Sequence, residues 1–182
     1  MTSMRVLVLS DTHGRTDRIQ QAVRQAGRFD LLVHAGDHAD DVLESFPHAV
    51  AVCGNCDDPS LAAVEQEVDL LGLKALVAHG HTLNVKTSPL PLLYRAAEAQ
   101  ADIAIYGHTH TPTLVEEEGR IFLNPGSLSY PRGFTVCTYC VIELTRRDAQ
   151  GQESEVEAQV QFYTLDGNPV PGFDLKKSWR GR

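Results

Sequence analysis

The stretch RVLVLSDTH, residues 5–13, carries Asp11 and His13 directly behind a run of four apolar residues. Alternating Val and Leu predict a β-strand over 5–9, so both polar side chains follow its carboxyl end. Similar clusters follow later apolar runs: Gly36-Asp37, Gly54-Asn55-Cys56-Asp57, His79-Gly80-His81 and Gly107-His108-Thr109-His110. In α/β folds the carboxyl ends of strands surround the crevice in which ligands bind. The pattern therefore predicts one site that is built from five loops.

Length and composition set the organisation of the chain. With 182 residues and 42% hydrophobic content, we expect one domain over 1–182 that buries a full core. Within it, 166–182 is expected to be an irregular C-terminal tail. The N-terminus lacks the features of a secretory signal, and no apolar run approaches the roughly 20 residues of a membrane span. We therefore expect a cytoplasmic protein without membrane association.

The charge of the chain restricts its partners. Sixteen Lys and Arg residues against 24 Asp and Glu residues give a net charge of -8, which repels polyanions. We expect no nonspecific nucleic-acid binding. A small anionic substrate is compatible with this charge because bound divalent cations reverse its sign locally. The sequence leaves homo-oligomerisation open.

The order of predicted elements indicates a mixed α/β architecture. Strands rich in Val, Ile, Leu or aromatic residues are expected over 5–9, 30–34, 49–52, 73–78, 102–106, 120–123, 135–144 and 156–165. Residues 67–71 are expected to form a hairpin with 73–78 through Gly72. Helices are expected over 17–26, 41–46 and 92–101. The polar segment 146–155 is expected to be a hairpin tip. Strands and helices alternate to about residue 110 and strands alone follow, which predicts a mixed fold.

Two CxxC pairs, Cys53 with Cys56 and Cys137 with Cys140, have the spacing of a structural zinc site. The second pair lies in a strand-like run without a turn residue, and positions three apart on a strand point to opposite faces. We therefore interpret Cys137 and Cys140 as small hydrophobic residues of a reduced protein.

The five motifs DxH, GD, GNxD, HG and GHxH, in this order, resemble those of the calcineurin-like metallophosphoesterases. The variant GNCD at 54–57, with NPGS at 124–127 and SYPR at 129–132, is similar to the small bacterial and archaeal phosphodiesterases of the YfcE type. The resemblance extends from about Arg5 to Leu144. It implies an α/β/β/α sandwich of two mixed β-sheets flanked by helices, the metallo-dependent phosphatase-like fold.

The resemblance also implies a dinuclear metal site. One metal ion would be held by Asp11, His13 and His110, and the other by Asn55, His79 and His108. Asp37 would bridge both ions. These oxygen and imidazole ligands suit two divalent ions, with Mn²⁺ favoured and Fe, Ni, Zn or Mg also compatible. The resemblance implies hydrolysis by metal-bound hydroxide.

Several residues are assigned to the substrate and to proton transfer. Asp37, Asn55 and His81 are the candidate catalytic residues, and Asn55, Cys56 and Arg132 are the candidates for substrate binding. Many relatives carry a His at position 56 that can protonate the leaving group, whereas a thiol donates weakly. Cys56 is equally compatible with an inert role, and Arg132 with an ordinary surface position.

The remaining histidines divide into two groups. His34, inside a predicted strand, and His48, in a loop, are expected to be structural. His38 and His81 adjoin metal-ligand candidates, so contact with the site and simple exposure both stay open for them.

The expected function is hydrolysis of a small phosphoester, with phosphodiesters as the first substrate class. The alternatives within enzymes are a phosphomonoesterase and a nucleotide pyrophosphatase. The alternative of another class is a non-catalytic metal-binding scaffold for protein interaction, as in one eukaryotic retromer subunit of this fold. Fold alone does not decide between these functions.

Overall fold

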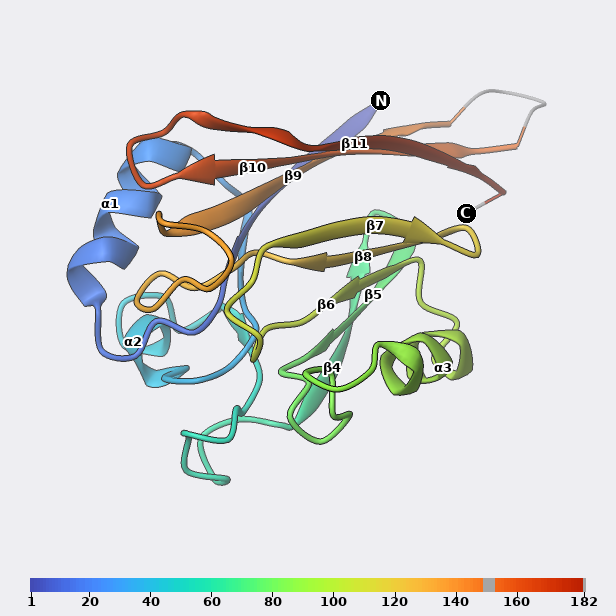
Figure 1. Ribbon diagram of the computed structural model, residues 1–182. Helices are drawn as coiled ribbons and strands as arrows, with labels where there is room; N and C mark the ends of the chain where they lie inside the picture. The colour runs from blue at the N-terminus through green and yellow to red at the C-terminus, as the bar shows by residue number, and fades with distance from the viewer. Residues whose placement is uncertain (149–152, 182) are drawn as a thin grey trace.

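Two β-sheets face each other, and helices cover their outer sides (Figure 1). The computed structural model describes residues 1–148 and 153–181. The first sheet has the strand order β11-β10-β9-β1-β2-β3 and the second has the order β4-β5-β6-β8-β7. The strands of the first sheet are β1 (Thr2–Leu9), β2 (Leu31–His34), β3 (Val50–Ala51), β9 (Thr138–Arg147), β10 (Glu155–Thr164) and β11 (Pro169–Arg180). Those of the second are β4 (Glu65–Leu70), β5 (Leu73–Ala78), β6 (Ile103–Ile105), β7 (Thr113–Glu117) and β8 (Arg120–Asn124).

Alternation of side chains along the strands builds the core between the sheets. Val6 and Val8 of β1 point into it, and Val77 of β5 and Ile105 of β6 meet them from the second sheet. These side chains are at most 1% exposed, and burial of such a side chain contributes roughly 1.5–3 kcal/mol to stability. The core therefore holds the two sheets face to face.

Over residues 1–148 and 153–181, three helices form the outer layers. α1 (Thr16–Ala26) buries Ile19 and Ala22 against the first sheet, and its regular spacing ends at Gly27, which has a φ of +71°. The short α2 (Asp40–Leu43) adds Val42 to the same apolar cluster. α3 (Leu90–Glu98) covers the second sheet with Leu92 and Ala96. α1 and α2 thus pack on the first sheet, and α3 packs on the second.

Strand direction brings the five motif loops to one side of the molecule. β1, β2 and β3 run parallel in the first sheet, and β5, β6 and β8 run parallel in the second. Each motif follows one of these strands at its carboxyl end. The α/β/β/α sandwich predicted from the sequence is confirmed.

The C-terminal segment differs from its prediction. Pro169–Arg180 is the edge strand β11 and not an irregular tail, because its residues pair with β10 and bury Trp179 to 9% exposure. Lys177 is held as well: its Nζ lies 2.6 Å from Glu116 Oε1 and 5.3 Å from the Trp179 ring centroid. The prolines and glycines of this segment interrupt the apolar alternation that is typical of a strand, and contacts with β10 stabilise the strand nevertheless.

Other differences concern the ends of elements. β7 was absent from the prediction, because its sequence TLVEE lacks a buried side chain: Thr113 and Leu114 are half-buried, and the three residues after them are exposed. The helix predicted over 41–46 extends only over 40–43. Of the hairpin tip predicted over 146–155, residues 149–152 lie outside the described part, whereas Arg146 and Arg147 end β9 and Glu155 begins β10.

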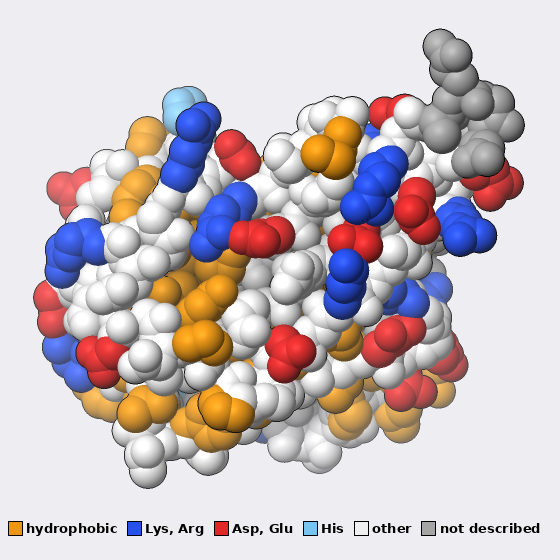
Figure 2. Space-filling model, turned by 90° about the horizontal axis from the view of Figure 1, so that it is seen from above, with side chains coloured by type: hydrophobic (Ala, Val, Ile, Leu, Met, Phe, Trp, Pro, Cys, Tyr) orange, Lys and Arg blue, Asp and Glu red, His pale blue; other side chains and the backbone are white. Residues whose placement is uncertain are grey.

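Charged side chains of both signs mix on the face seen in Figure 2. Ion pairs also join neighbouring strands of the first sheet: Arg147 contacts Glu155 and Glu157, and Lys176 contacts Glu157 at 3.1 Å. In the described residues, none of the helices has the length and apolar character required to cross a membrane.

Candidate metal centre

Carboxylate and imidazole groups from the motif loops converge in two clusters that share one residue. The first consists of Asp11, His13, Asp37 and His110, and the second of Asp37, His79 and His108; in each cluster the candidate ligand atoms lie within 4.8 Å of one another. Asp37 Oδ2 is 3.6 Å from His13 Nε2 and 3.4 Å from His79 Nε2. Asp37 therefore occupies the position between the two clusters.

Hydrogen bonds fix how two of these imidazoles are oriented. His79 Nδ1 donates to Ala35 O at 2.7 Å, and His110 Nδ1 donates to Tyr130 O at 2.8 Å. In the neutral rings, each Nε2 then bears a lone pair that is directed into the centre. Such backbone partners of a histidine ligand set its tautomer and orientation. Both rings are thus arranged to bind a cation through Nε2.

Lone pairs face one another inside the centre. His110 Nε2 lies 3.1 Å from Asp11 Oδ1, and both atoms are acceptors in the neutral tautomer. Among the described residues, Asp11 Oδ1, His13 Nε2 and His79 Nε2 are buried without a hydrogen-bond partner. Buried polar atoms are normally satisfied, so this arrangement fits a cation bound by the acceptors. Nitrogen and oxygen donors of this kind fit a divalent transition metal.

The pKa values agree with a centre that attracts positive charge. The Asp11 carboxylate, whose Oδ1 lies 3.1 Å from His110 Nε2, raises the pKa of His110. Burial opposes protonation of His79, but the nearby Asp37 and Asp11 carboxylates outweigh it and raise its pKa. Burial also opposes ionisation of Asp37, whereas contacts from His79 and Cys56 hold the pKa of that carboxyl well below its usual range. Asp37 is thus an anion at neutral pH.

The backbone of the candidate ligands is strained. Positive φ values occur at Asp11, His13, Asp37, His108 and His110, between 43° and 66°. Residues other than glycine rarely adopt this region, and such strain concentrates at functional sites. Close packing is a further sign: a Cβ at Gly54 would overlap Asp37, and one at Gly107 would overlap Ser10 and Asp11. The loops are therefore shaped around the two carboxylates.

Asp57 organises two loops of the centre without belonging to either cluster. Its Oδ2 accepts the backbone N–H groups of Asp37 at 3.0 Å and Gly54 at 2.8 Å. Its Oδ1 accepts those of His38 at 2.7 Å and Ala39 at 3.1 Å. One carboxylate thus ties the loop after β2 to the loop after β3. The GNxD spacing indicated a residue near the site, but not these four bonds.

Asn55 and Cys56 lie on the loop that contacts Asp37. Both are exposed, and Asn55 Nδ2 is 3.5 Å from Cys56 Sγ. The backbone N–H of Cys56 donates to Asp37 Oδ1 at 2.9 Å. Partial burial and the Asp37 carboxylate raise the pKa of the Cys56 thiol. Position 56 is therefore a neutral thiol at the rim of the centre.

His81 and Arg132 lie on the borders of the centre. The His81 ring centroid is 5.4 Å from that of His79 and 6.2 Å from that of His108. Burial, and then the charge of His79, lowers the pKa of His81. Arg132 is exposed, and its backbone N–H donates to His110 O at 2.9 Å. Both residues are thus near the ligands without joining the two clusters.

The other histidines also have defined places. The His38 ring centroid is 5.1 Å from that of His13. His34 is fully buried in β2, with Nε2 3.0 Å from Thr12 Oγ1, as expected of a structural residue. His48 is exposed in a loop.

The loop after β8 borders the centre. The hydrogen bonds that this loop makes were not predicted from the sequence. Ser127 Oγ and Ser129 Oγ donate to Asp11 O at 2.8 and 2.9 Å. Arg18 of α1 donates through Nη1 to the carbonyls of Leu128 and Ser129, both at 2.9 Å. NPGS and SYPR are the motifs that could have indicated the loop. The Arg18 contacts span more than 100 residues and leave no local pattern.

The cysteines do not assemble a zinc site. In the described residues, the groups of three or more His, Cys, Asp or Glu side chains that could hold one metal ion contain no cysteine. Cys140 points into the core between the sheets, while Cys137 packs on the cluster beneath α1. The two residues thus face opposite sides, as the strand pattern predicted.

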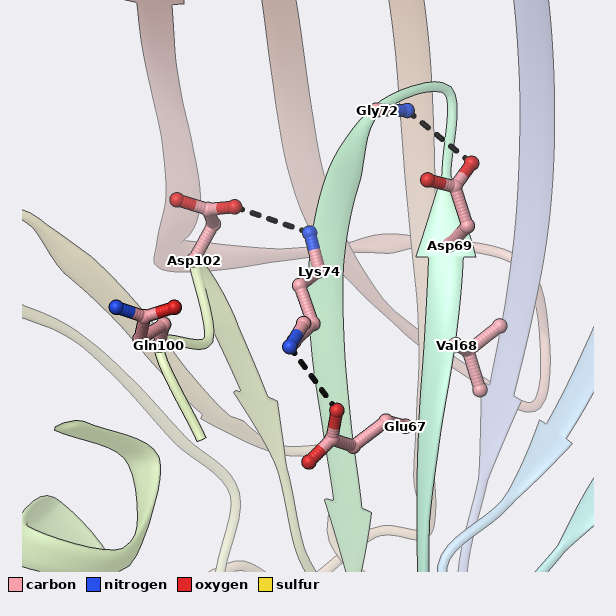
Figure 3. Close-up of a pocket in the computed structure, with 7 residues that line it drawn as sticks. All are labelled: Glu67, Val68, Asp69, Gly72, Lys74, Gln100 and Asp102. Atoms are coloured by element: carbon pink, nitrogen blue, oxygen red, sulfur yellow. Dashed lines mark hydrogen bonds and ion pairs between the residues drawn. The ribbon is translucent and has the colours of Figure 1, made fainter. Parts of the chain in front are cut away.

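A separate cavity of about 330 Å³ lies at the other end of the second sheet (Figure 3). Its polar groups bind one another: Lys74 Nζ is 3.0 Å from Glu67 Oε2, Lys74 N donates to Asp102 Oδ2, and Gly72 N donates to Asp69 Oδ1. These contacts stabilise the β4–β5 hairpin and the start of β6. The cavity is distinct from the metal centre, which lies at the carboxyl ends of β5 and β6.

Known proteins share the sequence and the architecture of this chain. A calcineurin-like phosphoesterase superfamily domain matches residues 4–147. YsnB of Bacillus subtilis (strain 168), a probable metallophosphoesterase, is 34% identical over 170 residues, which cover 92% of this chain and 95% of YsnB. The phosphodiesterase YfcE of Escherichia coli (strain K12) is 30% identical over 169 residues, 77% of this chain and 88% of YfcE. A predicted phosphoesterase from Streptococcus pneumoniae TIGR4 has a crystal structure with a TM-score of 0.79 and 29% identity, covering 98% and 99% of the two chains.

The facing mixed sheets, the His and Asp clusters at their strand ends and the family match together define a metal-dependent hydrolase. The chain belongs to the calcineurin-like phosphoesterase superfamily, as the order of its five motifs predicted. It is a metallophosphoesterase with candidate metal-binding residues in two clusters.

Proposed function

We propose that this chain is a phosphodiesterase with a dinuclear metal centre. The observation that carries the proposal is the place of Asp37, which belongs to both ligand clusters. A carboxylate has two oxygens and can serve two cations about 3.5 to 4 Å apart. One ion would be held by Asp11, His13 and His110, and the other by Asn55, His79 and His108, with Asp37 common to both.

Each residue of the centre would have its own role in hydrolysis. When bound, the two cations would lower the pKa of a water molecule and neutralise charge that develops on the phosphoryl oxygens. The backbone partners of His79 and His110 hold the Nδ1 protons, so each Nε2 is the atom that would bind a cation. Asp37 supplies negative charge to both positions, and Asn55 contributes an amide oxygen from the loop beside it. Arg132, exposed beside His110, is placed to attract an anionic substrate.

The proposal of phosphodiesters as substrates is based on the side chain at position 56. A neutral thiol at the rim is a weak proton donor and lacks a cationic form, so substrates with good leaving groups are favoured. The relative YfcE, named a phosphodiesterase, supports the same substrate class. His81 is the rival candidate for the proton donor, since its Nδ1 is buried without a hydrogen-bond partner in the described residues.

We propose Mn²⁺ as the preferred ion, with Fe, Ni, Zn and Mg as the ions to compare. The centre offers imidazole and carboxylate donors and no thiolate from its two clusters. Such mixed nitrogen and oxygen sites bind the middle first-row metals well.

The test is a substrate panel on protein that has been stripped with a chelator and reloaded with one metal at a time. We expect kcat/KM for an aryl phosphodiester to exceed that for the matching aryl phosphomonoester by at least about tenfold. A preference for the monoester, or for a nucleotide pyrophosphate, would establish the alternative enzyme class instead. Full metal content without hydrolysis of any of the three would indicate a metal-binding scaffold.

A further inference from the structure

Tyr130 is a large aromatic residue that stays exposed at the rim of the metal centre. Its side chain is 66% exposed, and its ring centroid lies 5.9 Å from that of His13, at an interplanar angle of 60°. Because this ring is mostly exposed to water, it contributes little to the stability of the folded protein. Exposed aromatic side chains beside a functional site are characteristic of binding surfaces.

The backbone of Tyr130 is held from several directions. Its carbonyl accepts the hydrogen bond of His110 Nδ1 at 2.8 Å, and its N–H donates to Ser127 Oγ at 2.9 Å. Two residues later, the N–H of Arg132 donates to His110 O at 2.9 Å. The loop from 130 to 132 is thus fastened to His110 at two points. The backbone of Tyr130 is therefore held in a fixed place beside the candidate ligands, and the ring starts from that place.

The backbone and the side chain of Tyr130 have separate roles. The carbonyl of Tyr130 orients His110, whereas the ring makes no hydrogen bond with the centre in the described residues. A side-chain change at this position can therefore alter the rim while the orientation of His110 is kept.

We propose that Tyr130 is a specificity-determining residue that stacks against a planar aromatic substituent of the phosphoester, such as an aryl ring or a nucleobase. The proposal rests on the function proposed above and narrows its substrate class. A phosphate group bound at the centre would bring its substituents within reach of the ring beside His13. Every nucleobase and aryl group offers a π-face, so stacking on tyrosine tolerates different rings. Arg132, two residues along the chain, adds positive charge that acts on His110.

The test compares two diesters whose leaving groups have matched pKa values, one aryl and one fluorinated alkyl. Matched pKa values remove differences in leaving-group quality, so only the stacking contact differs. We expect Tyr130→Leu to lower kcat/KM for the aryl diester about tenfold, chiefly through KM. The fluoroalkyl diester should change less than about twofold, and Tyr130→Phe should behave as wild type, because both substitutions leave the backbone bond to His110 in place.

Tyr94 provides the matched control, because it is 70% exposed on α3, outside the two ligand clusters. Tyr94→Leu should leave both rates unchanged. Metal content, measured by mass spectrometry, should be equal in all variants. A nucleoside diester, compared with the aryl diester, shows which of the two ring types is preferred.

A binding measurement decides the proposal without turnover. Wild-type protein loaded with Mn²⁺ should bind phenyl phosphate about tenfold more tightly than methyl phosphate, and Tyr130→Leu should lose this difference. Equal losses for both ligands, or no loss, would overturn the stacking role. If wild type cleaves no diester, the proposed function fails on its own, while the binding comparison still decides the role of Tyr130.

Discussion

The backbone N–H of Cys56 donates a hydrogen bond to Asp37 Oδ1 at 2.9 Å. Position 56 therefore supports the shared carboxylate through an atom that every residue except proline possesses. The side chain at this position is free to vary without loss of that bond. Replacement of an imidazole by a thiol here changes proton donation and leaves the support of Asp37 intact.

We predict that hydrolysis by the wild-type protein depends steeply on the pKa of the leaving group. General acid catalysis contributes about 10²- to 10⁴-fold, and the Cys56 thiol is a weak donor. Aryl diesters should therefore be cut much faster than alkyl diesters. Cys56→His should selectively improve poor leaving groups if the ring reaches the ester oxygen.

Rates across esters of graded leaving-group pKa, for wild type, Cys56→His and His81→Ala, check this prediction. His81 is the rival donor, since its ring lies 5.4 Å from that of His79. A flat dependence in wild type that steepens only in His81→Ala would transfer the acid role to His81.

Asp57→Asn should weaken metal binding by roughly 10- to 100-fold, as loss of an outer partner of a metal site does. The amide replaces one oxygen by an NH₂ group, which would face N–H donors from Asp37 and Gly54 or from His38 and Ala39. Stability should fall by about 2 kcal/mol, because hydrogen bonds to a charged acceptor are lost. Isothermal titration with Mn²⁺ and chemical unfolding measure the two effects.

Asp58→Asn is the matched control for Asp57→Asn. Asp58 is the neighbouring exposed residue, and its carboxylate binds only Ser60 among the described hydrogen-bond partners. Metal affinity should be unchanged in this variant. Equal effects of the two substitutions would contradict the organising role of Asp57.

Cys53, Cys137 and Cys140 should be dispensable for metal content. All four cysteines are free, and Cys140 is fully buried in the core between the sheets. A variant with alanine at the three positions should keep its metal stoichiometry and lose stability through the small cavities that form. Stoichiometric loss of metal from a folded triple variant would restore the zinc interpretation of the CxxC pairs.

Stability should fall with acidification because His34 is buried in its neutral form. Its Nδ1 accepts the N–H of Gly36 at 3.2 Å, which leaves the proton on Nε2 beside Thr12 Oγ1. Burial lowers the pKa of His34 from 6.5 to about 4. Between these values the unfolded state binds more protons, so stability is full above about pH 6.5 and declines toward pH 4. The decline from this residue is on the order of 3 kcal/mol.

Chemical unfolding in the presence of a chelator, for wild type and His34→Gln, isolates this effect. Every other side chain is the same in both proteins, so the difference in slope reports His34. The slope between pH 6.5 and 4 should be smaller in the variant by up to about 1.4 kcal/mol per pH unit. Identical slopes would show that His34 takes up its proton in the folded state.

The sequence predicted the elements that local patterns determine. Runs such as VLVL before Asp11 identified the strands, and the motifs behind them identified the residues of both clusters. β11 was not predicted, because Pro169, Pro171 and Gly172 interrupt the alternation typical of a strand. Pairing with β10 stabilises this strand. In the centre, the bonds from Arg18 to the loop after β8 join distant parts of the chain. Contacts of this kind depend on the three-dimensional fold and leave no periodic signal.

The most direct test of the central claim is the metal content of wild type and Asp37→Asn, measured together with activity as metal is added to stripped protein. With Asp37 common to both clusters, wild type should bind two ions per chain and reach full activity only with the second. Asp37→Asn should keep its circular dichroism spectrum, lose metal, and lose activity by at least about 10²-fold. Full activity with one ion per chain, or wild-type metal content and rate in Asp37→Asn, would contradict the dinuclear centre.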